Sequence, residues 1–149
     1  MTTTVGQPEK PLNSSLAAPL QGPVSLNLPF SSESAGEVRR ALASWLTHLG
    51  SNESVINDAR LVVTELVGNA VRHASPLANG TVLVRWHHDA DQLVLSVCDG
   101  GGDSSPVAEE TELDSERGRG LVIVQALALR WCVEHNHRVH AVHVRMPLL

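Results

Sequence analysis

ELVGNAVRH, residues 65–73, is the stretch that decides how this chain is interpreted. It places the carboxylate of Glu65 and the carboxamide of Asn69 four residues apart, so a helix would present both on one face. A carboxylate can polarise a hydroxyl or a water, and a carboxamide oxygen can ligate a hard cation such as magnesium. Taken alone, the pair favours an ordinary solvated helix face, so the rest of the chain has to decide.

The surrounding sequence predicts strands and helices in alternating groups. Apolar residues that recur every three or four positions predict a helix over residues 52–74 and another over residues 35–49, which Ser31 or Ser32 would cap and Gly50 would end. Strands are expected at residues 24–30, 81–88, 92–98, 131–134 and 139–146, with a third helix at 121–129. This order predicts an α+β fold, a two-layer α/β sandwich with helices on one face of a mixed, mostly antiparallel sheet.

Composition narrows the class of protein. The chain has 149 residues, 42% of them hydrophobic and 3% aromatic, and a formal charge of −5. We expect a disordered tail at residues 1–23 and one domain at residues 24–149. The acidic balance argues against nucleic acid or a membrane as partner, and the lack of a spanning or signal segment predicts a cytoplasmic protein. Cys98 and Cys132 lie in apolar segments and are expected to be buried, reduced thiols.

Two glycine-rich segments supply what a nucleotide site needs. CDGGGD, residues 98–103, follows an apolar strand, and Asp99 could accept a hydrogen bond from an amino group such as that of adenine. RGRGL, residues 117–121, precedes the third helix, where backbone N–H groups and the charges of Arg117 and Arg119 suit phosphate. Each segment alone favours an ordinary turn, but together with the polar helix face they indicate a nucleotide site.

These three segments resemble the N box and the two glycine boxes of the Bergerat-fold ATP-binding superfamily of gyrase, histidine kinases, MutL and the ATPase heat-shock chaperones. The likeness is greatest to the small anti-sigma-factor serine/threonine kinases and their actinobacterial relatives. Residues 65–74 and 116–124 carry it most specifically, and it covers about residues 24–147. It implies the Bergerat ATP-binding fold, with ATP and Mg²⁺ as cofactors.

The resemblance also implies a role for each matching residue. Glu65 would be the catalytic carboxylate that activates the attacking hydroxyl, and Asn69 would hold Mg²⁺ against the phosphates. Asp99 would bind the adenine amino group, and Gly101 would allow the base to approach closely. Arg72 and His73 end the N box and would lie near the nucleotide. The second glycine box would lie on the phosphate side, beneath a lid over about residues 102–117, and comprises Arg117, Gly118, Arg119, Gly120 and Leu121.

The implied function is that of an ATP-binding regulatory protein, a kinase that phosphorylates a STAS-type anti-sigma-factor antagonist and could also sequester a sigma factor. A homodimer, with the helix over residues 35–49 contributing a face, is compatible with this resemblance. Two departures keep an alternative open: Asp103 replaces a glycine of the first box, and the last hairpin, residues 135–140, lacks the usual Gly-Lys-Thr-like turn. The alternative is a weak or inactive nucleotide-binding module that acts by partner sequestration. A histidine-kinase catalytic domain cut from a sensor ranks lower, because no phosphoacceptor hairpin is expected before the domain.

Eight histidines raise a metal-site hypothesis. His135, His137 and His143 are separated by even numbers of residues, so on one strand they would share a face, but no cysteine or carboxylate stands at ligand spacing. We therefore expect surface histidines in a hairpin.

Overall fold

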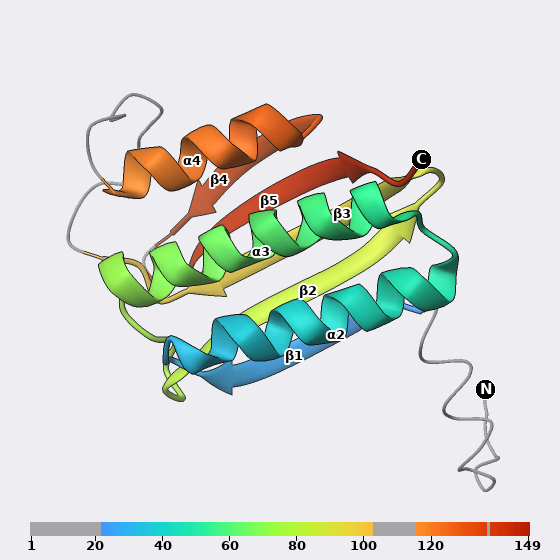
Figure 1. The fold of residues 1–149 in the computed structure, drawn as a ribbon. Helices are drawn as coiled ribbons and strands as arrows, with labels where there is room; N and C mark the ends of the chain where they lie inside the picture. The colour runs from blue at the N-terminus through green and yellow to red at the C-terminus, as the bar shows by residue number, and fades with distance from the viewer. Residues whose placement is uncertain (1–21, 103–115, 137) are drawn as a thin grey trace, which may run out of the picture.

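The computed structural model describes residues 22–102, 116–136 and 138–149, with the backbone alone described for residues 116–120. Within these residues a five-stranded sheet forms one layer, and three helices cover one of its faces (Figure 1). The opposite face of the sheet carries no helix in this part of the chain (Figure 1). The predicted two-layer α/β sandwich is confirmed.

The sheet has the strand order β1-β2-β3-β5-β4, and each of its four pairings is antiparallel. Within the described residues it is therefore more uniform than the mixed, mostly antiparallel sheet that the sequence predicts. All five expected strands are present, each within two residues of its expected bounds: β1 (Val24–Pro29), β2 (Thr81–Asp89), β3 (Gln92–Asp99), β4 (Arg130–His135) and β5 (His140–Pro147).

The two long helices, α2 (Glu33–Leu49) and α3 (Glu53–His73), form where the apolar periodicity predicts them. The side chain of Asn52 caps α3 by accepting a hydrogen bond from the N–H of Val55 at 2.9 Å. At the other end Ala74 is already extended, as expected two residues before Pro76. The helix that carries the N box is thus fixed in length by local sequence signals at both ends.

The core lies between the helices and the sheet. Alternate residues of β2 and β3 and one stripe of each long helix are buried there, mostly valine, leucine and alanine. Trp45 from α2 and Trp86 from β2 meet edge to face, with ring centroids 6.4 Å apart and an interplanar angle of 74°. This packing holds α2 and α3 against the sheet and so positions the polar residues of α3. No helix within the described residues is long and apolar enough to span a bilayer.

The third helix, α4 (Glu116–Leu127), begins earlier than the sequence predicts. The expected helix opened at Leu121 after a glycine turn, whereas Gly118 and Gly120 lie within the first two helical turns. A glycine inside a helix costs only about 1 kcal/mol, which packing of α4 against α3 can offset. The remainder of the expected lid, residues 103–115, lies outside the described residues.

The two cysteines differ in exposure. Cys98 is buried on β3, as expected, but Cys132 is exposed, so the expectation of two buried thiols is wrong. Cys132 lies on the edge strand β4 opposite His143, on the sheet face that no described helix covers. Burial raises the pKa of the Cys98 thiol, which keeps it protonated and unreactive near neutral pH.

We expect Ellman's reagent to titrate one thiol rapidly in the folded protein and the second after addition of denaturant. Cys132→Ser should abolish the rapid phase, because the remaining thiol is both buried and protonated. A rapid phase that survives in Cys132→Ser would contradict the burial of Cys98.

Candidate functional site

Two backbone hydrogen bonds join the end of α3 to the end of β3. The N–H of Ser75 donates to the carbonyl of Gly101 at 2.7 Å, and the N–H of Gly100 donates to the carbonyl of Ser75 at 2.8 Å. This bridge connects the segment after the N box to the first glycine box, which are far apart in the sequence. It brings the two halves of the predicted site to the same end of the molecule.

The two glycines of the bridge have structural reasons to be glycine. A Cβ on Gly100 would lie 2.1 Å from the carbonyl oxygen of Pro76, a distance that no packed side chain tolerates. Gly101 has φ +82°, in the left-handed region that favours glycine. The sequence predicts either an ordinary glycine-rich turn or close approach of a ligand at these glycines. It does not reveal the bridge, because Ser75 contributes backbone atoms that carry no side-chain signature.

The N-box residues occupy the C-terminal half of α3. Asn69 is buried and Glu65 is half-buried, so the ordinary solvated face considered above does not describe Asn69. The guanidinium of Arg72 donates to Oδ1 of Asn69 at 3.4 Å, while the side chains of Arg72 and His73 are exposed. A carboxamide oxygen has two lone pairs, so Oδ1 of Asn69 could accept from Arg72 and also ligate Mg²⁺.

Asp99 ends β3 with its carboxylate almost fully buried, the side chain being 5% exposed. Its Oδ1 accepts a hydrogen bond from the N–H of Gly101 at 2.7 Å. Its Oδ2 lies 3.5 Å from Nδ1 of His140, the residue directly opposite on β5. That contact is not aligned as a hydrogen bond, so Nδ1 of His140 is buried without a hydrogen-bond partner.

The buried polar atoms of this end fit a nucleotide base. A buried carboxylate without an aligned partner for its second oxygen costs free energy, which a polar ligand that donates to Asp99 would recover in part. The sequence argument named His140 solely as part of an atypical hairpin. Its importance follows from the pairing register of β3 with β5, which the sequence does not reveal.

The second glycine box differs from the expectation. Gly118, Gly120 and Leu121 do not form a turn, because all three lie within α4. The first four N–H groups of a helix have no acceptor within the helix, so a helix N-terminus such as that of α4 is a type of backbone end that can bind an anion. Leu121 is half-buried, and the side chains of Arg117 and Arg119 lie outside the described residues.

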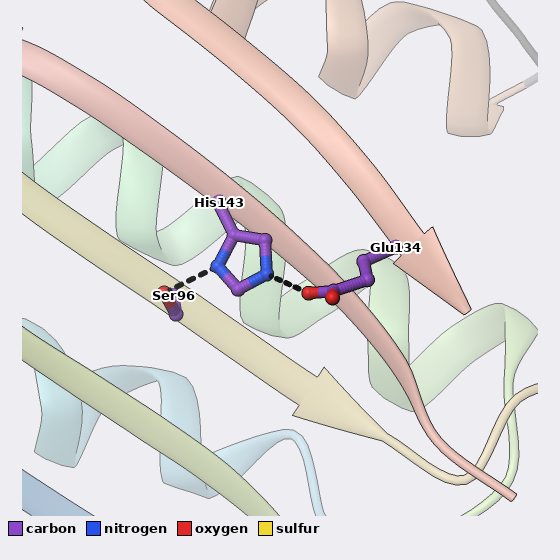
Figure 2. Close-up of polar contacts among 3 residues, drawn as sticks. All are labelled: Ser96, Glu134 and His143. Atoms are coloured by element: carbon purple, nitrogen blue, oxygen red, sulfur yellow. Dashed lines mark hydrogen bonds and ion pairs between the residues drawn. The ribbon is translucent and has the colours of Figure 1, made fainter. Parts of the chain in front are cut away.

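A second polar cluster lies on the sheet face away from the helices (Figure 2). Ser96 Oγ is 2.7 Å from Nδ1 of His143, and Nε2 of His143 is 2.8 Å from Oε1 of Glu134. In a nucleophilic triad the serine meets Nε2 and the carboxylate meets Nδ1, the reverse of this order. Both β3 and β5 are interior strands, so their backbone N–H groups serve the sheet and do not form a backbone oxyanion hole beside Ser96. The cluster is a cross-strand network that stabilises the sheet.

Among the described residues, no group of three or more histidine, cysteine, aspartate or glutamate side chains is placed to hold a metal ion. His143 instead bonds Ser96 and Glu134, and His135 is exposed. A magnesium ion at Asn69 would therefore need phosphate oxygens and waters to complete its shell.

The model of the histidine kinase-like ATPase domain matches residues 28–146. The chain belongs to this family. The resemblance drawn from the three sequence segments is thereby confirmed at the level of family and fold.

Members of this family with a curated name are similar over most of the chain. The serine-protein kinase RsbW of Bacillus velezensis is 30% identical over 128 residues, 78% of this chain and 80% of that protein. The protein of the same name from Bacillus subtilis is 28% identical over 116 residues, covering 70% and 72% of the two chains. A solved structure of the RsbU and RsbW domains of Rv1364c from Mycobacterium tuberculosis gives a TM-score of 0.67 at 23% identity. The match covers 85% of this chain and 32% of the longer chain in that structure. At this level of identity the similarity supports the fold alone.

Gly100→Ala should destabilise the protein by at least about 2 kcal/mol, because the Pro76 carbonyl cannot move without breaking the bridge. Gly36→Ala is the matched control. Its Cβ would meet flexible arginine side chains at 3.4 Å or more, and a helical alanine should leave stability unchanged or raise it by up to about 1 kcal/mol. Urea unfolding followed by circular dichroism measures both, and equal midpoints for the two variants would contradict the role of the bridge.

Proposed function

We propose that this chain is an ATP-dependent serine/threonine kinase of the anti-sigma-factor type. Its substrate would be an antagonist protein of the STAS class, and it could also hold a sigma factor. Membership of the histidine kinase-like ATPase family supports this, as does the similarity to proteins named serine-protein kinase. The observation that carries the proposal is the backbone bridge that brings the N-box helix and buried Asp99 to one end of the fold.

Each residue of the site has a defined task in this proposal. Bound Mg-ATP would supply the phosphoryl group that is transferred. Asp99 accepts a hydrogen bond from the base, and Asn69 offers Oδ1 to the magnesium ion, with Arg72 orienting the carboxamide. Glu65, one helical turn before Asn69, accepts the proton of the serine or threonine hydroxyl as its oxygen attacks the phosphorus and ADP departs.

The net charge of the chain supports the proposed type of partner. A chain with a formal charge of −5 suits partners with a basic docking surface, since complementary charge raises the rate of encounter. The proposal places this reaction in the cytoplasm, where ATP and sigma factors are present.

Glu65→Ala should retain Mg-ATP binding but lower phosphoryl transfer to a matched antagonist by about 100-fold or more, because the base is removed while the nucleotide contacts remain. Calorimetry measures binding, and mass spectrometry of the antagonist measures transfer. Glu37→Ala, an exposed position on α2, is the control and should change neither. Unchanged transfer by Glu65→Ala would reject the assigned role of Glu65.

The second candidate function is a binding module that sequesters a partner without catalysis. Asp103 in the first glycine box and the atypical hairpin before His140 favour it. Calorimetry and thermal unfolding with Mg-ATP distinguish the two candidates. The kinase requires heat of binding and a raised Tm, whereas no heat and no change in Tm would favour the module.

A further inference from the structure

The outer edge of β4 is unpaired within the described residues. β4 ends the strand order β1-β2-β3-β5-β4, so no described strand lies beyond it (Figure 1). The N–H of Asn136 donates to the carbonyl of Val139 at 2.9 Å, a hydrogen-bonded pair that continues the β4–β5 register. Bonded and non-bonded pairs alternate along an antiparallel ladder, so the backbone N–H and C=O groups of Trp131 and Val133 point away from β5. These groups are free to bond another strand.

The side chains of β4 follow a self-complementary order. Arg130, Cys132 and Glu134 are exposed and share the sheet face that no described helix covers. Trp131 and Val133 are half-buried and pack against the core or beside it on the other face. A second β4 turned end for end about Cys132 would therefore set arginine against glutamate and tryptophan against valine. The other edge strand, β1, has the sequence VSLNLP and carries no charge.

Arg130 has an unfavourable neighbour within the single chain. It lies directly opposite Arg145 on β5, and like charges in that position destabilise a sheet. Arg145 is paired with Asp89 at 3.2 Å, whereas Arg130 takes part in no hydrogen bond or ion pair within the described residues. Glu134 offers Oε1 to His143, and its Oε2 has no contact in this part of the chain. A carboxylate from outside the chain would offset the charge of Arg130.

We propose that two copies of this chain pair through the outer edges of β4, antiparallel about a two-fold axis that passes beside Cys132. Each Arg130 then meets Glu134 of the second copy, and the two Cys132 side chains face each other. The two sheets join into one continuous sheet. This surface is not that of α2, and its formation needs no nucleotide, so the inference is independent of the proposed function.

The register makes Cys132 a reporter of this interface. Pairing through the outward backbone groups of Trp131 and Val133 leaves Cys132 at a non-hydrogen-bonded position, where facing Cα atoms lie about 4.5 Å apart. That separation falls within the range that a disulfide spans. A six-residue strand buries little area, so the dimer should form reversibly, and its thiols should stay reactive through the free monomer.

Oxidation by diamide under native conditions tests the register. Two thiols release two electrons and two protons, which diamide takes up, and a dimer linked through Cys132 should appear on non-reducing gels and in peptide mass spectra. Cys132→Ser should give no covalent dimer, because Cys98 is buried. Glu37→Cys in the Cys132→Ser background moves the thiol to an exposed position on α2. It should cross-link at least about tenfold more slowly, because pairing raises the effective concentration at Cys132 alone.

Exchange of the charges tests the occupant without an oxidant. Sedimentation velocity under reducing conditions should show a concentration-dependent dimer, which Arg130→Glu weakens by about tenfold, because two symmetry-related pairs become like-charged together. Arg130→Glu combined with Glu134→Arg restores opposite charges and should recover the dimer. Arg40→Glu, the same change at an exposed position on α2, is the control and should dimerise as the wild type.

Each outcome decides for or against the β4 dimer. Preferential cross-linking at Cys132 and recovery in the double exchange support it. A wild-type chain that stays monomeric at every concentration, or equal cross-linking from Cys132 and from position 37, overturns it. A dimer that Arg40→Glu disrupts and Arg130→Glu does not would also overturn it. The comparison of cross-linking rates needs no change at Arg130, so it decides the matter even if that variant does not fold.

Discussion

The bridge between Ser75 and the Gly100–Gly101 pair is the constraint on which the site depends. Its two hydrogen bonds use backbone atoms of a segment that has just left α3 and of a segment that has just left β3. Core packing holds α3 over the sheet. The bridge adds a direct link between the end of the helix and the end of β3, and so helps to fix where Asn69 stands relative to Asp99.

The same constraint explains the glycines better than ligand contact does. Gly100 is packed against the Pro76 carbonyl, and Gly101 turns the chain with a positive φ so that its N–H reaches Oδ1 of Asp99. The carboxylate is therefore oriented before any ligand arrives. Preorganisation of this kind lowers the cost of binding, because the side chain has already lost its freedom.

The sequence predicts the fold well because its signals are local and strong. Apolar periodicity predicts α2 and α3 nearly to the residue, and alternation predicts all five strands. The start of α4 is less predictable, since two glycines signal a turn while packing against α3 stabilises a helix. Cys132 is exposed because β4 lies at the edge of the sheet, and strand order is not a local property of the sequence.

The candidate site shows the same difference between residues that local sequence signals identify and residues that matter through long-range contacts. Asn69 and Asp99 carry side-chain chemistry at recognisable spacing, so the sequence identifies them. His140 and Ser75 matter through strand register and backbone hydrogen bonds, which become visible in three dimensions. The hairpin that departs from the family pattern ends at His140, which the β3–β5 register places opposite Asp99. A histidine in a polar cluster is not sufficient by itself, as His143 shows on the opposite face of the sheet.

A titration with Mg-ATP followed by two-dimensional amide NMR tests the central claim most directly. The account predicts that the backbone amide of Gly101 and the side-chain amide of Asn69 shift together along one binding curve. Signals of Ser96 and His143, on the far face of the sheet, should stay in place (Figure 2). Shifts confined to one half of the site, or no shifts at saturating Mg-ATP, would contradict the claim that the bridge assembles a single nucleotide site.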